Sequence, residues 1–219
     1  VCISDDQKAH FEGLFGRPAR RVYNGCASEI YKPLGIPRTK RFLFLARFST
    51  IKGPDLAIKA CKHAGVGLDL IGDTSITNEP EYLQKCMAMA DGKQIRMIGP
   101  ATRGNCVWWY SQAHAFLHLC PNFREPFGLA PVEAGLSGLP IIAWKYGALS
   151  ETVKDRTTGI LVTSMDEAVE AVLVVANDPQ WSSEEARQDC REWASQFSVE
   201  NMVNGYETLC KEAVETGGW

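Results

Sequence analysis

Two glutamates eight positions apart, Glu125 and Glu133, are the side chains best placed to do chemistry in this sequence. Between them lie Gly128 and Pro131, which are typical of a helix start, so we expect a helix over residues 127–136. A helix start offers unpaired N–H groups and the positive end of the helix dipole, which together bind anions. Carboxylates on both sides of an anion site indicate that hydroxyl groups are held there as well. A phosphate-linked sugar has both kinds of group.

Two basic residues, Arg47 and Lys52, lie in one loop directly after an apolar stretch at residues 42–45. An arginine can fork onto two phosphate oxygens, and a lysine acts as a compact positive charge. The alternative is that both are loop cations that meet only solvent, as charged loop residues usually do.

Short apolar stretches alternate with helical patterns through the middle of the chain. We expect strands at residues 41–46, 68–73, 94–98, 115–119, 139–143 and 159–162, and helices at 55–64, 79–91, 103–113, 127–136, 148–153 and 164–178. This alternation predicts an α/β fold with a doubly wound parallel sheet that is buried on both faces. Ligands bind at the carboxyl ends of such strands, so one rim should be lined by residues 47–52, 72–73, 99–103, 121–133 and 145–148.

The two ends of the chain predict elements of a different kind. A capped helix is expected over residues 5–15, followed by a strand and turn at residues 20–25. Two more helices should follow the helix at residues 164–178, one starting near Ser182 and one at Ser198. The last helix carries an apolar stripe at helical spacing, made of Met202, Tyr206, Leu209 and Ala213.

The central stretch resembles the donor-binding half of the retaining glycosyltransferases of family four, also described as group 1 glycosyltransferases. Their signature is a glutamate, a Phe-Gly-Leu step and a second glutamate, which here are Glu125, residues 127–129 and Glu133. The continuation at residues 138–143 and 147–151 also resembles that family. The similarity runs from about Tyr23 to Leu161 and is looser at both ends.

The resemblance implies a role for each candidate residue. The basic pair in the loop after the first strand would hold the donor diphosphate. Glu133 would hold the ribose, because a carboxylate accepts hydrogen bonds from vicinal hydroxyls. Glu125 would contact the transferred sugar and stabilise positive charge there. The backbone N–H groups of the signature would stabilise the leaving diphosphate, and they belong to Phe127, Gly128 and Leu129.

The implied fold is a Rossmann-like doubly wound sheet, the C-terminal half of a two-domain glycosyltransferase of the GT-B type. Residues 1–20 would end the preceding acceptor domain, residues 21–180 would bind the nucleotide sugar, and residues 181–219 would form C-terminal helices, the last crossing back to the missing N-terminal domain. The chain begins with Val1 rather than Met, which favours a fragment. The implied reaction transfers a sugar from a UDP-, GDP- or ADP-sugar to an acceptor with retention of configuration, and the fragment alone should transfer little.

Two other functions remain open on the sequence. One is a non-catalytic nucleotide-sugar-binding module, or a partner subunit that completes its cleft with a separate chain. The other is a sugar-nucleotide epimerase of the same architecture, for which we would expect more acid and base residues near the diphosphate. A nicotinamide dinucleotide site is disfavoured, because no Gly-x-Gly-x-x-Gly follows the first strand.

We expect neither a metal nor another cofactor. No Asp-x-Asp motif is present, and the two basic residues and a helix start would balance the diphosphate charge instead. His114 and His118 are four positions apart, which in a strand would put them on one face of the sheet, and we interpret His118 as a packed residue. The eight cysteines are scattered without a Cys-x-x-Cys motif, which is typical of buried thiols in a reducing cytoplasm.

The bulk composition excludes two classes of partner. The formal net charge of −3 gives no indication of nucleic-acid binding, and no apolar run approaches the ~20 residues that span a bilayer. No secretory signal is visible, so we expect a cytoplasmic protein.

Overall fold

The computed structural model describes residues 1–74 and 79–217 and contains one six-stranded sheet in the order β3-β2-β1-β4-β5-β6. All of its strand pairs are parallel. The strands are β1 Phe42–Leu45, β2 Leu68–Ile71, β3 Ile95–Gly99, β4 Ala115–His118, β5 Ile141–Trp144 and β6 Gly159–Val162. The strand order reverses between β1 and β4, and this reversal confirms the predicted doubly wound arrangement.

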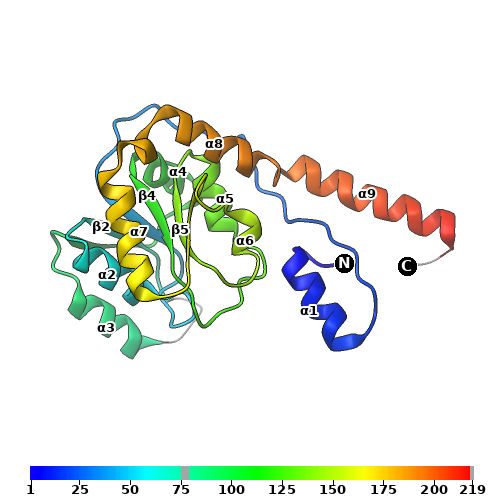
Figure 1. The fold of residues 1–219 in the computed structure, drawn as a ribbon, viewed down its shortest axis with the longest axis horizontal. Helices are drawn as coiled ribbons and strands as arrows, with labels where there is room; N and C mark the ends of the chain where they lie inside the picture. The colour runs from blue at the N-terminus through cyan, green and yellow to red at the C-terminus, as the bar shows by residue number, and fades with distance from the viewer. Residues whose placement is uncertain (75–78, 218–219) are drawn as a thin grey trace.

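Helices cover both faces of the sheet (Figure 1). One face packs against α2 Pro54–His63, α3 Pro80–Met89 and α7 Met165–Asn177, and the other packs against α4 Arg103–Gln112, α5 Leu129–Leu136 and α6 Leu149–Thr152. The strands are apolar on both sides because each side meets one of these layers, and β2 and β4 are buried along their whole length.

Beyond the sheet lie α1 Asp5–Phe15, the 3₁₀ helix Pro179–Ser182, α8 Glu184–Ser195 and α9 Val199–Thr216. Figure 1 shows α9 continuing outward from α8, away from the sheet, with both termini on that side of the molecule. On α9 only Leu209 is buried within the described residues, and Tyr206 is 39% exposed. The stripe predicted on this helix is therefore only partly covered: Leu209 is buried, Met202 and Ala213 are half-buried, and Tyr206 is exposed.

Three sequence expectations are corrected by the structure. The helix expected over residues 127–136 begins at Leu129, because Gly128 has a φ of 90° and cannot continue a right-handed helix. The helix expected near Ser182 begins at Glu184, because Pro179 first starts a 3₁₀ turn and Ser183 then caps α8. No strand forms at residues 20–25, where Arg21 makes a single isolated bridge to Cys2.

The predicted division of the chain into domains at residues 1–20, 21–180 and 181–219 stays a prediction. Residues 218 and 219 of the last segment lie outside the described part of the chain. Among the helices that the structure describes, none is both long and apolar enough for a membrane span. None of the eight cysteines, all of which lie in the described residues, forms a disulfide, and six of them are buried, as expected from their apolar surroundings.

Candidate active site

Glu125 lies in the loop that follows β4, and the backbone on both sides of it is held in place. Its carbonyl oxygen accepts a hydrogen bond from the amide of Ala148 at 2.9 Å, and the residue forms a parallel bridge with Gly147. A Cβ atom at position 147 would lie 2.5 Å from that carbonyl oxygen, so this close approach requires a glycine. The loops after β4 and β5 thus fix Glu125, which is 7% exposed.

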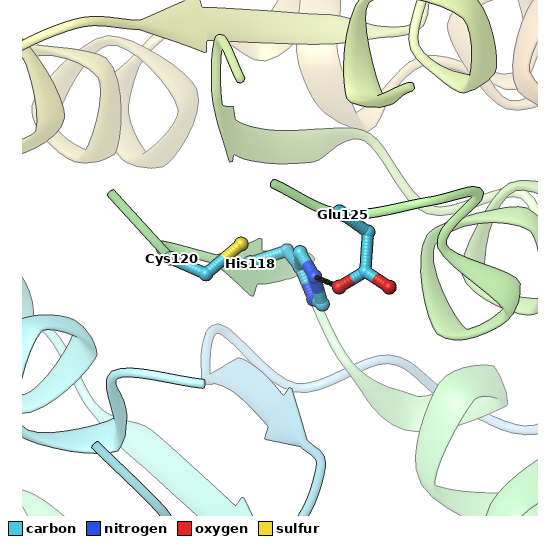
Figure 2. Close-up of side chains that lie close together, drawn as sticks. All are labelled: His118, Cys120 and Glu125. Atoms are coloured by element: carbon cyan, nitrogen blue, oxygen red, sulfur yellow. Dashed lines mark hydrogen bonds and ion pairs between the residues drawn. The ribbon is translucent and has the colours of Figure 1, made fainter. Parts of the chain in front are cut away.

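The carboxylate of Glu125 is bound by two side chains at a single oxygen. Oε2 accepts from Nζ of Lys52 at 2.5 Å and lies 3.0 Å from Nε2 of His118. Figure 2 shows the His118 ring, at the end of β4, turned toward this carboxylate. Burial alone would raise the pKa of Glu125, but the hydrogen bond and charge of His118 and the charge of Lys52 outweigh it and lower the pKa to about 2. Glu125 is therefore ionised at neutral pH.

Lys52 reaches this carboxylate because its loop folds against the end of β4. Gly53 follows it with a φ of 64°, and a Cβ atom there would lie 2.3 Å from the carbonyl oxygen of Leu119. The ammonium group of Lys52 also lies 4.6 Å from the centre of the Phe123 ring. The structure thus brings one of the two predicted phosphate-binding cations into contact with the predicted catalytic acid.

Arg47 is placed differently. It is exposed, and it lines a hollow of about 220 Å³ at the carboxyl ends of β1, β2 and β3, together with Ile71, Gly72, Asp73, Pro100 and Ala101. It takes no part in the cluster around Glu125. Arg47 and Lys52 therefore lie at two separate places along the carboxyl-terminal edge of the sheet.

The start of α5 supplies the predicted anion-binding amides. Gly128 is the N-cap, and within the described residues no side chain caps this end of the helix. The amides of Leu129 and Ala130 have no acceptor within residues 1–74 and 79–217, and Pro131 has no N–H to satisfy. The side chain of Phe127 is buried against the rings of Tyr23 and Phe197, which anchors the turn before the helix.

Glu133 has partners that the sequence analysis missed. Its two carboxylate oxygens accept from the hydroxyl groups of Tyr31 at 2.7 Å and Tyr110 at 3.0 Å. Burial of Tyr110 and the charge of Glu133 raise the pKa of that phenol well above its usual value. Tyr31 lies far away in sequence, in a segment without helix or strand, so no local pattern indicated this contact.

A second missed cluster connects α1 to the loop that carries Glu125. Glu151 of α6 accepts from the amides of Asp5 and Asp6, and Arg124 pairs with the carboxylate of Asp6 at 2.8 and 2.9 Å. A carboxylate at the first turn of a helix suits the helix dipole. The neighbour of Glu125 is therefore bound to an element that the sequence analysis assigned to the preceding domain.

The group His118, Cys120 and Glu125 offers nitrogen, sulfur and oxygen atoms within 4.8 Å of one another, a donor set that zinc accepts (Figure 2). The Glu125 oxygen is already bonded to an ammonium group, however, and burial, followed by the charge of Glu125, raises the pKa of the Cys120 thiol to about 12. The oxygen of Glu125 that faces His118 is thus already engaged by Lys52. That this site holds no metal stays a prediction.

The two histidines do not share a face of the sheet, contrary to expectation. His114 lies before β4, bonds to the carbonyl oxygen of Val175 in α7 and packs against Phe42. His118 lies on the other face, stacked on Phe116. Side chains alternate between the two faces only within a strand, and β4 begins only at Ala115, so His114 does not follow this alternation.

Comparisons with known proteins agree with this geometry. The family model described as glycosyl transferases group 1 matches residues 28–197. The D-inositol 3-phosphate glycosyltransferase 1 of Catenulispora acidiphila is 27% identical over 231 residues, which cover 93% of this chain and 54% of that protein. A 41.2 kDa protein from the cps region of Klebsiella pneumoniae is 31% identical over 173 residues, covering 77% of this chain and 45% of that protein.

Two solved structures share the fold. Anabaena HepE in complex with UDP-glucose has a TM-score of 0.82 and 22% identity, covering 96% of this chain and 63% of that one. Sucrose-phosphate synthase from Thermosynechococcus elongatus has the same TM-score and identity, and the match covers 98% of this chain and 58% of that one. These likenesses confirm the predicted fold class, and this chain spans about half the length of the curated relatives it matches. The chain belongs to the family of group 1 glycosyl transferases.

Proposed function

We propose that this chain is the donor-binding part of a retaining glycosyltransferase of family four, which transfers a sugar from a nucleoside diphosphate sugar to an acceptor. One observation carries the proposal: the uncapped start of α5 packs beside Glu125, which is paired with Lys52, and Glu133 follows one turn into the same helix. Anion-binding amides, a half-buried cation and two carboxylates suit a diphosphate that joins two hydroxyl-bearing groups.

The diphosphate would bind to the amides of Leu129 and Ala130 and to the ammonium group of Lys52. These groups stabilise the negative charge that develops on the leaving diphosphate as the bond to the sugar breaks. Because Lys52 lies 2.5 Å from Glu125, a phosphate bound to this ammonium brings the anomeric carbon of the sugar close to the carboxylate. Glu125, kept ionised by its two partners, would then stabilise positive charge on the sugar ring.

The nucleoside would extend from the diphosphate in the other direction. Glu133 lies one turn into α5, and its carboxylate, which is oriented by the hydroxyl groups of Tyr31 and Tyr110, would hold the ribose. The hollow beside Arg47, at the carboxyl ends of β1 to β3, would take the base or the outer phosphate oxygens. The HepE structure with UDP-glucose makes a uridine nucleotide the first candidate among UDP, GDP and ADP.

The acceptor would be bound by a further domain. This chain spans 54% of the Catenulispora relative and 63% of the HepE chain, so a second wall of the cleft is expected from an N-terminal acceptor domain. We therefore expect this chain by itself to bind the donor weakly and to transfer little.

Calorimetry tests the proposal. We expect this chain to bind UDP, GDP or ADP more tightly than the corresponding nucleoside, with no loss of affinity in excess EDTA. Lys52→Ala and Arg47→Ala should weaken diphosphate binding and leave the nucleoside nearly unaffected, and Lys62→Ala, an exposed cation at the far end of α2, is the matched control. Equal affinity for the diphosphate and the nucleoside would contradict a site built to bind the diphosphate. Affinity that needs magnesium would contradict a site that works without a metal.

A further inference from the structure

A cluster of arginines lies at the edge of the sheet opposite to the candidate active site. Arg38 belongs to the segment before β1, and Arg187 and Arg191 lie one turn apart on α8. They line a hollow of about 380 Å³ together with Pro33, Gly35, Ile36, Ser111 and Glu184. The active-site loops follow the carboxyl ends of the strands, whereas this hollow adjoins segments that lead into β1, β4 and β5.

The backbone fixes the arginines in this cluster. The guanidinium group of Arg38 donates to the carbonyl oxygens of Ala113 at 3.1 Å and Ser137 at 2.8 Å. Gly138, the next residue, has a φ of 71°, and a Cβ atom there would lie 2.8 Å from a terminal nitrogen of Arg191 and 3.4 Å from Cβ of Arg187. All three arginines therefore meet around the turn between α5 and β5.

The positive charge of the cluster is only partly balanced. Glu184 pairs with Arg191 at 2.5 Å, but its side chain is 73% exposed. The guanidinium group of Arg187 has no hydrogen-bond or ion-pair partner in the part of the chain that the structure describes, and its backbone amide donates to the carbonyl oxygen of Ser183. Burial, and then the charges of Arg187 and Arg191, lower the pKa of Arg38 to about 10. The protein thus holds three guanidinium groups around a hollow that contains one exposed carboxylate.

We propose that this hollow is a second anion site, distinct from the donor site, that binds the phosphate group of a small phosphorylated ligand. Guanidinium groups recognise phosphate through paired N–H donors, and Arg187 has its donors available. Arg38 is already oriented by two carbonyl groups and loses little side-chain entropy when an anion binds. A bound phosphate would relieve the repulsion among the arginines and hold α8 against the turn at residues 137–138.

A four-variant experiment separates the two anion sites. Thermal unfolding of the chain is followed while inorganic phosphate replaces chloride at constant ionic strength, for wild type, Arg187→Ala, Lys52→Ala and the double variant. We expect phosphate to raise the unfolding midpoint of wild type and of Lys52→Ala, and the apparent affinity for phosphate to fall roughly tenfold or more in Arg187→Ala. Without phosphate, the midpoint of Arg187→Ala should not fall below that of wild type, because a like charge has been removed. Lys62→Ala is the control for loss of one exposed charge.

Two results would overturn the proposal. One is a phosphate response that disappears in Lys52→Ala and is unchanged in Arg187→Ala, which would place all binding at the donor site. The other is retention of the chain on phosphatidic acid vesicles, lost in Arg187→Ala, without any response to free phosphate. That second result would indicate a membrane surface rather than a small ligand.

Discussion

Two carboxylates on the same rim have different surroundings, and under the proposed function this difference predicts different tasks for them. Glu125 is bonded to a cation and a histidine, whereas Glu133 is bonded to two neutral phenols. An acid that holds the ribose contributes equally in the ground and transition states, so its loss weakens binding. An acid that faces the anomeric carbon matters most as positive charge develops there, so its loss slows turnover.

The substitutions Glu133→Gln and Glu125→Gln should separate these tasks. In this chain Glu133→Gln should weaken nucleoside diphosphate binding about tenfold, the effect of one charge-assisted hydrogen bond, and Glu125→Gln should leave it nearly unchanged. In the complete enzyme Glu125→Gln should reduce kcat by ~100-fold. Tyr31→Phe is the control for Glu133, because it removes one neighbouring bond and keeps the carboxylate. The opposite pattern, or unfolding of both variants in a thermal melt, would refute the assignment.

The lowered pKa of Glu125 also makes a prediction about acid stability. Because the pKa in the folded protein, about 2, is below the ordinary value of ~4.3, the ionised carboxylate stabilises the fold above that ordinary value, and this stabilisation is lost as the pH falls through 2. Glu125→Gln should therefore cost about 1–3 kcal/mol of unfolding free energy at pH 7 and progressively less toward pH 2. Urea unfolding at a series of pH values measures this difference. Glu170 is exposed, so Glu170→Gln should change the unfolding free energy by the same amount at every pH. A loss of unfolding free energy in Glu125→Gln that does not vary with pH would contradict the ion pair.

At the scale of elements, the start of α5 depends on one glycine. Gly128 has a φ of 90°, and a Cβ atom there would lie 3.1 Å from Cδ2 of Leu149. The left-handed turn lets the chain leave the buried Phe127 and begin the helix at once. Placement of the anion-binding amides therefore depends on this conformation.

Gly128→Ala should destabilise the fold by roughly 1–2 kcal/mol through backbone strain and should weaken diphosphate binding as well. Gly104→Ala is a matched control, because Gly104 lies in α4 with no atom within 4 Å of an added Cβ, and it should stabilise by about 0.4–1 kcal/mol. Chemical denaturation and UDP titration of both variants measure the two effects. Unchanged stability and affinity in Gly128→Ala would show that the turn is not constrained in this way.

The order and type of the central elements could be predicted from apolar stretches and helix caps, because these signals are local. The starts of α5 and α8 could not, since they depend on a left-handed glycine and on a 3₁₀ turn. In the candidate site, the contact between Lys52 and Glu125 and the bonds of Glu133 to its tyrosines were missed for a related reason. These contacts join segments 73, 102 and 23 positions apart, and only the packed fold brings them together.

At the scale of the whole molecule, α1 and α9 present apolar side chains that the described chain does not cover. On α1, Leu14 and Phe15 are 65% and 62% exposed, and on α9, Val214 is 84% exposed. These two elements lie on the same side of the molecule (Figure 1). We infer that they dock against the acceptor domain of the proposed two-domain enzyme, as the resemblance to such enzymes implies.

Hydrogen exchange tests this inference. In the isolated chain the amides of α9 should exchange much faster than those of β1 and β4, because few tertiary contacts hold the helix. The same amides should become protected in the complete enzyme. Equal protection of α9 and the central strands in a monomeric fragment would mean that the helix is fully packed on its own domain.

The most direct test of the proposed function is to locate a bound diphosphate on the chain. In a ¹⁵N-labelled sample titrated with UDP, the largest amide shift changes should fall on Gly128, Leu129 and Ala130, with smaller ones around Lys52. Uridine alone should leave the amides at the start of α5 nearly unchanged. Shift changes that avoid this helix start and instead cluster at the opposite edge of the sheet would contradict the assignment of the donor site.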